Sequence, residues 1–318
     1  MKNHLVAILS VLSIAAGIYG YIELNSQTKD KSRFDPEIKS DEGYLNDISK
    51  EKDFAGALSR LALKGNRDSR SHILDNFSKY SNFIKRSSLQ SLGYFDDPEV
   101  NNFLLSQINS YRIATLKGLG LKESEKRRVI LKELNILDFT EEELVYYHLA
   151  VFKTSSLFSQ KKKNLNFLIA KAYELNRGET FEDIIFSLSV HVPNFEKFHK
   201  LLEDKLFTTK NEKVIARAVR HLSVYRSGWL KTQSKRVFET NNLILLKSYL
   251  DRAPSFCPLN IWILFNEHYN SNEEVILKSA FSLNTKKAVE LIKEKESKVS
   301  GLYKKYQDKF SNNVSVCL

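Results

Sequence analysis

The chain has 318 residues and a formal net charge of +11, from 49 basic and 38 acidic side chains. A hydrophobic fraction of 42% is ordinary for a globular protein and excludes a wholly disordered chain. Two cysteines are too few for a disulfide framework or a cysteine-based zinc site, and five prolines leave room for long helices.

Residues 5–22 form an apolar run, LVAILSVLSIAAGIYGYI, of 18 residues without a charge. The run is long enough for a transmembrane helix and also suits a secretory signal, so residues 1–24 are predicted to be a signal anchor or a signal peptide. We favour the uncleaved anchor, and a buried core helix is the remaining alternative. Basic residues flank the run on both sides, so its orientation stays open, and we favour an exported body.

Residues 25–53 contain few large apolar side chains and are predicted to be a polar, disordered tether. Alternatively, this segment lies on the first helices through Phe34, Ile38, Tyr44 and Leu45. Residues 54–311 are predicted to be all-α, because no stretch shows the alternation of a strand, and residues 312–318 to be a flexible tail. Three Thr-x-x-acid sequences predict helix starts, at Thr140, Thr180 and Thr209.

An internal repeat lies between residues 84 and 120. Leu92 and Gly93 recur 27 residues later as Leu119 and Gly120, each pair at the end of an apolar helical stripe. Gly93 is expected to close its helix in the left-handed conformation. The following Asp-Pro, at residues 97 and 98, has the residue types of an N-cap and a first helical position. The unit is therefore a pair of helices, and neither helix can bury its apolar face alone.

The same mark, an apolar residue followed by Leu three positions later and then a small or polar residue, recurs along the chain with one weaker copy. Its leucines are spaced 27 to 39 residues apart, within the range of helical-repeat proteins. This spacing predicts an α-solenoid of about eight helix pairs, in which each pair contacts its neighbours. The leucines are Leu61, Leu92, Leu119, Leu149, Leu188, Leu222, Leu250 and Leu283.

The stretch from residue 84 to residue 120, with its Leu-x-x-Leu-Gly and Asp-Pro-Glu, resembles the short HEAT-like repeats of bacteria, the kind also found in phycobilin lyases. The resemblance implies a curved stack of helix pairs that serves protein–protein contact, with the second helix of each pair on the concave side. Tetratricopeptide repeats have a similar period and are the second choice. Ankyrin repeats are less favoured, because no Thr-Pro-Leu-His occurs. Lyase activity is not inferred, because a fold does not carry a function with it.

Residues 205–236 contain nine basic side chains and a single acid. Lys213, Arg217 and Arg220 recur at helical spacing, so we expect them on one face of a helix that begins near residue 211. With Arg226 and Trp229 they form a candidate surface for the anionic groups of a partner. The alternative is an ordinary solvated face. Two smaller basic clusters, at 126–128 on a helix flank and 161–163 in a loop, are expected to have no function.

No His-Glu-x-x-His, phosphate-binding loop or nucleophile elbow occurs, so we predict no enzyme activity, no metal and no cofactor. The favoured function is a membrane-tethered helical-repeat scaffold that binds protein partners in the bacterial cell envelope. Its body would be exported from an inner-membrane anchor or secreted to the periplasm. The alternatives are a binder of nucleic acid or another anionic polymer with a HEAT-like fold, and an enzyme whose residues converge only in three dimensions.

Overall fold

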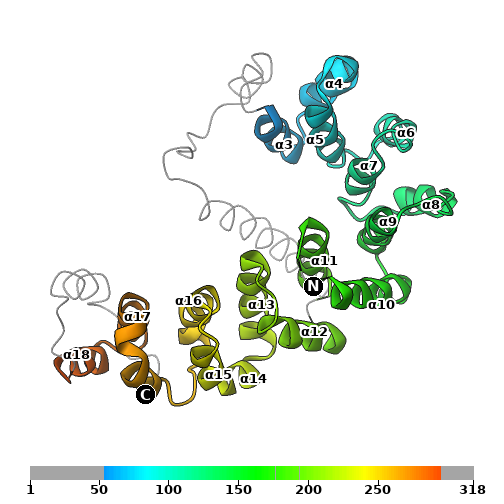
Figure 1. Cartoon of the computed structure of the whole chain (residues 1–318). Helices are drawn as coiled ribbons and strands as arrows, with labels where there is room; N and C mark the ends of the chain where they lie inside the picture. Colours follow the sequence, from blue (N-terminus) through cyan, green and yellow to red (C-terminus); the bar gives the residue numbers. More distant parts are fainter. Residues whose placement is uncertain (1–53, 176, 193, 295–318) are drawn as a thin grey trace, which may run out of the picture. The chain divides into compact units, whose positions relative to one another are not determined.

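The computed structural model describes residues 54–294, except residues 176 and 193 (Figure 1). The predicted anchor, tether and tail lie outside the described residues. Within these limits the chain is helical and contains no β-strand. No helix of the described part is both long enough and apolar enough to cross a bilayer. The chain divides into two compact units, which we call unit 1, ending at Ala170, and unit 2, beginning at Lys171.

Unit 1 is built from pairs of short helices (Figure 1). Helices α3, α5, α7 and α9 pack against one another in sequence order, and α4, α6 and α8 pack beside them. One row of helices is thus continuous, and the other covers it. The elements are α3 Phe54–Leu63, α4 Arg67–Asn76, η1 Phe77–Lys79, α5 Asn82–Leu92, α6 Pro98–Ser106, α7 Arg112–Leu119, α8 Glu125–Glu133, α9 Glu141–Thr154 and α10 Phe158–Glu174, which runs into unit 2.

In unit 2, α13 is the central element and packs against α11, α12, α14 and α16. Helix α17 packs against α15, α16 and α18 and is kinked at Asn272. Cys257, between α16 and α17, has a φ of 47° and is disulfide-bonded. The elements are α11 Glu179–His191, α12 Glu196–Leu206, α13 Glu212–Tyr225, α14 Ser227–Thr232, α15 Ser234–Glu239, α16 Leu243–Arg252, η2 Ala253–Ser255, α17 Ile261–Leu283 and α18 Thr285–Glu294.

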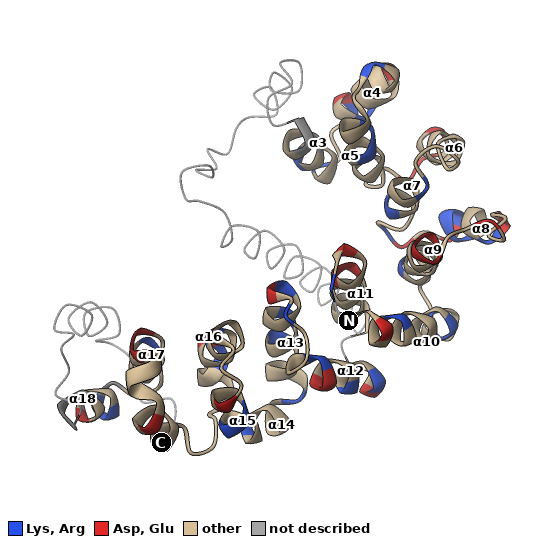
Figure 2. Cartoon of the chain, viewed as in Figure 1, with Lys and Arg blue, Asp and Glu red and all other residues tan. Residues whose placement is uncertain are grey.

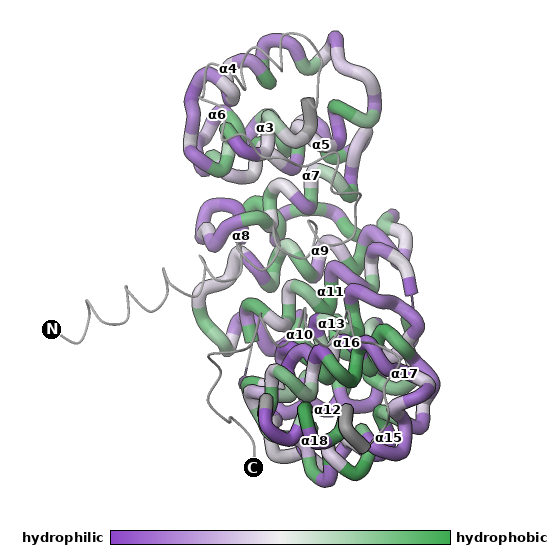
Figure 3. The backbone as a smooth tube through the Cα atoms, turned by 90° about the vertical axis from the view of Figure 1, so that its left-hand side faces the viewer, coloured by the Kyte–Doolittle hydropathy of each residue, from purple (hydrophilic) through white to green (hydrophobic). Residues whose placement is uncertain are grey.

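The eight recurring leucines all lie in the core, as their spacing predicts. Each is at most 3% exposed, and they fall one each on α3, α5, α7, α9, α11, α13, α16 and α17. Figure 3 shows hydrophobic and hydrophilic positions alternating along these helices, as expected when one face is buried and the other is solvated. The repeating mark in the sequence therefore locates the first helix of each successive pair.

The glycines of the repeat have a different role from the one expected. Gly93 ends α5 with a φ of −58°, so it is not in the left-handed conformation. A Cβ on Gly93 would lie 2.3 Å from the carbonyl oxygen of Gly118, and one on Gly118 would lie 2.3 Å from the Leu89 oxygen. A Cβ on Gly120 would lie 2.6 Å from the Cα of Ala150 in α9. These glycines are needed because the backbones of α5, α7 and α9 approach so closely.

The predicted helix starts are confirmed in part. Asp97 caps α6, where its side chain accepts a hydrogen bond from the Val100 N–H and Pro98 follows, and Thr140 forms a full capping box at α9. The other two Thr predictions are wrong, because α11 begins after Gly178 and α13 after Asn211. The Asn211 side chain accepts from the Val214 N–H. A cap two residues away therefore replaces Thr209.

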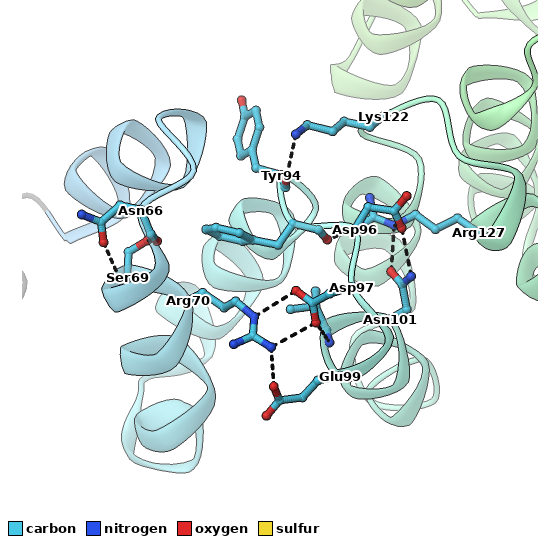
Figure 4. Close-up of polar contacts among 12 residues, drawn as sticks. Asn66, Ser69, Arg70, Tyr94, Asp96, Asp97, Glu99, Asn101, Lys122 and Arg127 are labelled. Carbon is cyan, nitrogen blue, oxygen red and sulfur yellow. Dashed lines mark hydrogen bonds and ion pairs between the residues drawn. The ribbon is translucent and has the colours of Figure 1, made fainter.

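Arg127, on α8, connects two consecutive helix pairs of unit 1, α5 with α6 and α7 with α8 (Figure 4). Its side chain is 0% exposed, and it donates hydrogen bonds to the Gly93 oxygen at 2.7 Å, to the Asn101 side chain at 2.8 Å and to the Phe95 oxygen. Asp96 lies 3.4 Å from its Nε. The expectation that residues 126–128 are an ordinary helix flank therefore fails for Arg127, which sequence alone could not place in the core.

The prediction for the second small basic cluster, residues 161–163, is also wrong. Residues 161–163 lie within α10 and not in a loop. Lys161 is buried, with its Nζ 5.6 Å from the centroid of the Phe152 ring. Burial lowers the pKa of Lys161. The apolar stem of the lysine thus packs as a core side chain does.

Polar contacts between helices reach only to neighbouring elements. Where both partners are described, no hydrogen bond joins residues more than 34 positions apart, the separation between Arg127 and Gly93. Comparable bonds in other parts of the chain span 27 to 32 residues. These separations match the period read from the leucines, so these bonds join an element to the one that lies one repeat before or after it.

Candidate anion-binding site

The predicted basic face lies on α13. The helix begins at Glu212, close to the predicted start, and its apolar face is fully buried against α11, α12 and α16. In Figure 2, α11 carries acidic positions, and basic and acidic positions occur together on α12 and α13. Some cations of this region therefore have an acidic partner within the described part of the chain, and others do not.

Lys213 has such a partner. Its side chain is exposed, and its Nζ lies 2.9 Å from Oε2 of Glu182 on α11. The other oxygen of Glu182 accepts a hydrogen bond of 2.9 Å from the side chain of Asn211. The charge of Lys213 is thus opposed by a carboxylate one repeat earlier.

Arg226 is also neutralised within unit 2. Its Nε lies 3.0 Å from Glu203, and its Nη1 lies 3.2 Å from Glu196, both on α12. Trp229 on α14 is half-buried, and its ring centroid lies 6.4 Å from that of Phe207. The guanidinium of Arg236 stacks on the same Phe207 ring, 3.9 Å from its centroid. Arg226 and Trp229 are therefore engaged by their own chain.

Arg217 differs from the other predicted site residues, because it is a buried cation without an acid. It is 8% exposed, and its Nε has no hydrogen-bond partner. Its guanidinium carbon lies 4.8 Å from the centroid of the Phe186 ring on α11. Burial lowers the pKa of Arg217 to about 10, and the charge of Arg220 acts in the same direction. The expectation of a solvent-facing Arg217 is corrected, since Phe186 covers it.

Arg220 lies one turn further along α13 and is partly exposed. Among the described residues, no carboxylate lies within ion-pair distance of the guanidinium of either Arg217 or Arg220. Two like charges on one helix face repel each other, and a buried cation without a counter-charge is unfavourable. An oxyanion between the two guanidinium groups would relieve both effects. We call Arg217 and Arg220 the arginine pair.

Lys205 and Lys235 do not extend the arginine pair into a continuous positive surface. Lys205 is buried and donates to the carbonyl oxygens of Tyr173 at 2.8 Å and Leu175 at 3.0 Å. Lys235 lies 3.8 Å from Glu239 on the same helix. The cluster read from the sequence thus separates into cations with internal roles and a small unpaired set.

Sequence reasoning missed two parts of this region. Phe186 is not part of any motif, although it precedes Arg217 by 31 residues, the same separation as Glu182 and Lys213. His199 and His221 are buried side by side, with ring centroids 5.5 Å apart, and both rings contact Tyr225. Within the described ranges, no group of three His, Cys, Asp or Glu side chains is arranged to hold a metal ion.

Comparisons with protein-family models, with curated proteins and with solved structures each give no match. The resemblance of residues 84–120 to HEAT-like repeats therefore stays a prediction.

Proposed function

We propose that the chain is a helical-repeat scaffold that binds a protein partner, tethered to a membrane of the bacterial cell envelope by residues 5–22. One observation carries the proposal. Eight leucines at the repeat period are all buried, one on each of eight successive first helices. Repeat arrays with contacts only between neighbours present extended surfaces, and proteins of this architecture commonly use those surfaces for binding.

In the proposed arrangement, about eight HEAT-like helix pairs stack as a solenoid, and the first helices line the partner-facing side. This reverses the expectation drawn from the resemblance. In unit 1 the first helices α3, α5, α7 and α9 pack directly on one another, which favours them as the inner, more closely spaced row. In unit 2 the arginine pair lies on α13, which carries Leu222 of the recurring mark and is therefore also a first helix.

The charges of unit 2 favour a protein partner over nucleic acid, the second candidate. Lys213 and Arg226 are paired with carboxylates, and Glu179 and Glu182 occupy the first turn of the neighbouring α11. Nucleic-acid binders neutralise many phosphates through a continuous basic surface. A surface of mixed charge suits a polypeptide, which carries charges of both signs.

Photocrosslinking in the native cells tests the proposal. A benzophenone amino acid replaces Val224, which is 66% exposed and one turn beyond Arg220 on α13, or Leu137, which is 92% exposed in unit 1. We expect a discrete, nuclease-resistant protein adduct from position 224 and a different or weaker pattern from position 137. Adducts from position 224 that disappear on nuclease treatment, or that consist only of a general smear, would argue against a protein scaffold.

The membrane tether is tested separately. The full chain should stay in the membrane pellet after alkaline carbonate extraction, and a variant without residues 1–24 should be released. A full chain that is itself released by carbonate would remove the tether and leave the scaffold proposal intact.

A further inference from the structure

We propose that the arginine pair, Arg217 and Arg220, is a receptor for a side-chain carboxylate in an acidic peptide segment of the partner. This inference rests on the proposed scaffold function and adds the chemistry of the ligand. It depends on three features of unit 2: a buried guanidinium without a counter-charge, an aromatic ring that orients it, and neighbouring carboxylates that exclude a polyanion.

The first feature is the unsatisfied state of Arg217. The residue is 8% exposed and its Nε has no hydrogen-bond partner. By contrast, Arg127, which is 0% exposed in unit 1, donates to four groups of its own chain and lies next to Asp96. Proteins seldom keep a buried guanidinium unpaired, because its desolvation is unfavourable. The contrast between the two arginines indicates that Arg217 is kept for a group from outside the chain.

The second feature is orientation. Phe186 packs against the guanidinium of Arg217 and restricts it, as stacking on an aromatic ring does. The edge of a guanidinium carries its donors, and two parallel donors match the two oxygens of a carboxylate. Arg220, three residues along the same helix, lies on the same face and supplies a second cation. The pair therefore suits a small, bidentate oxyanion.

The third feature selects a peptide carboxylate over a phosphate polymer. Glu182, four residues before Phe186 on α11, lies on the same helix face and is already paired with Lys213. A chain of phosphates that reached the arginine pair would also approach this carboxylate. In the other direction, Val190 and Val224 lie one turn beyond Phe186 and Arg220, and both side chains are exposed. An acidic residue flanked by apolar residues would therefore match both the charge and the apolar surface.

A binding assay with the full chain in detergent micelles tests this inference. The probe is a fluorescein-labelled peptide of alternating Glu and Leu, followed by anisotropy, and the control peptide has Gln in place of each Glu. We expect the Glu peptide to bind and the Gln peptide to bind at least about tenfold more weakly. Arg220→Gln should weaken binding of the Glu peptide by about tenfold or more, because a charged hydrogen-bond donor is lost. Arg217→Met should do the same, with the fold checked by tryptophan fluorescence.

The matched control is Lys210→Gln, which removes the same charge from an exposed residue just before α13. It should change binding by less than about twofold. Equal losses in Arg220→Gln and Lys210→Gln would overturn the inference, because they would indicate diffuse attraction. No binding of the Glu peptide at millimolar concentration, or displacement of that peptide by a single-stranded oligonucleotide at lower concentration, would also overturn it. In either case an Arg220-independent crosslink from position 224 would leave the scaffold function standing.

Discussion

Replacing Arg217 with methionine is expected to stabilise unit 2, although it removes a charge from the arginine pair. The pKa of Arg217 is lowered to about 10, chiefly by burial. Such a shift corresponds to about 3 kcal/mol of unfavourable free energy in the charged form. The contact with Phe186 returns about 1–2 kcal/mol, and methionine would keep part of it through its sulfur. The expected net gain is therefore about 1–2 kcal/mol.

The sign of the effect follows from the direction of the pKa shift. The folded-state pKa of Arg217 lies below the unfolded-state pKa, so the unfavourable free energy is fully present well below pH 10 and fades only as the pH rises from there towards the unfolded-state pKa. The gain on replacement should accordingly be the same at any pH near neutrality.

The assay is urea denaturation followed by tryptophan fluorescence. Both tryptophans of the chain, Trp229 and Trp262, lie in unit 2, so their emission reports on that unit alone. Arg220→Met is the control, because Arg220 is partly exposed and its replacement should change stability by less than about 0.5 kcal/mol. A loss of stability in Arg217→Met would refute the reasoning, since it would mean that the charge is satisfied within the folded chain.

Three further predictions concern unit 1 and its polar contacts. Gly118→Ala should destabilise the fold by more than about 2 kcal/mol, because its Cβ would lie 2.3 Å from a backbone oxygen. The control is Gly228→Ala in unit 2, whose Cβ meets nothing within 4 Å and which should gain about 0.5 kcal/mol. Circular dichroism during urea unfolding compares the two variants, and equal effects would contradict the close approach of α5 and α7. Arg127→Met should lower the free energy of unfolding by about 3 kcal/mol or more, because it leaves buried acceptors without a donor. It should also reduce hydrogen-exchange protection in α5 to α8. Unchanged protection would count against the role of Arg127 in connecting these helices. Burial alone would raise the pKa of Asp97, but hydrogen bonds from Arg70 and a backbone N–H hold it below its usual value, so the stabilisation is present at neutral pH and lost in acid. Arg70→Ala should therefore be less stable than wild type at pH 7, and the difference should vanish as the pH falls through the carboxyl pKa; a difference that persists in acid would exclude this linkage.

The parts of the fold that were predicted from sequence depend on signals local to one helix. The recurring leucines report the buried face of each first helix, and Asp97 with Pro98 reports a helix start. Such signals can be read from a single sequence, because an apolar stripe or a cap acts within a few residues of its own position. The start of α13 expected near residue 211 lies within one residue of the observed start, whereas the start predicted at Thr209 does not.

The parts that were missed depend on the neighbour one repeat away. Lys213 and Arg217 lie one helical turn apart on the same face of α13. Lys213 is nevertheless exposed, whereas Arg217 is covered by Phe186 of α11. Arg127 and its sequence neighbours look alike as a basic run, but only Arg127 is turned towards Gly93 and Phe95. A single sequence gives the residue types on each helix and not the rotation of one helix against the next.

The short reach of the polar contacts, at most 34 residues where both partners are described, has a consequence for how the protein is made. Proteins dominated by local contacts fold rapidly, because little loop entropy opposes each step. A helix pair in this chain needs only the pair before it, so folding can proceed during synthesis, from the N-terminal side, as each new segment leaves the ribosome. Any export machinery that requires an unfolded substrate would then have to engage the chain within the time that a few tens of residues take to emerge.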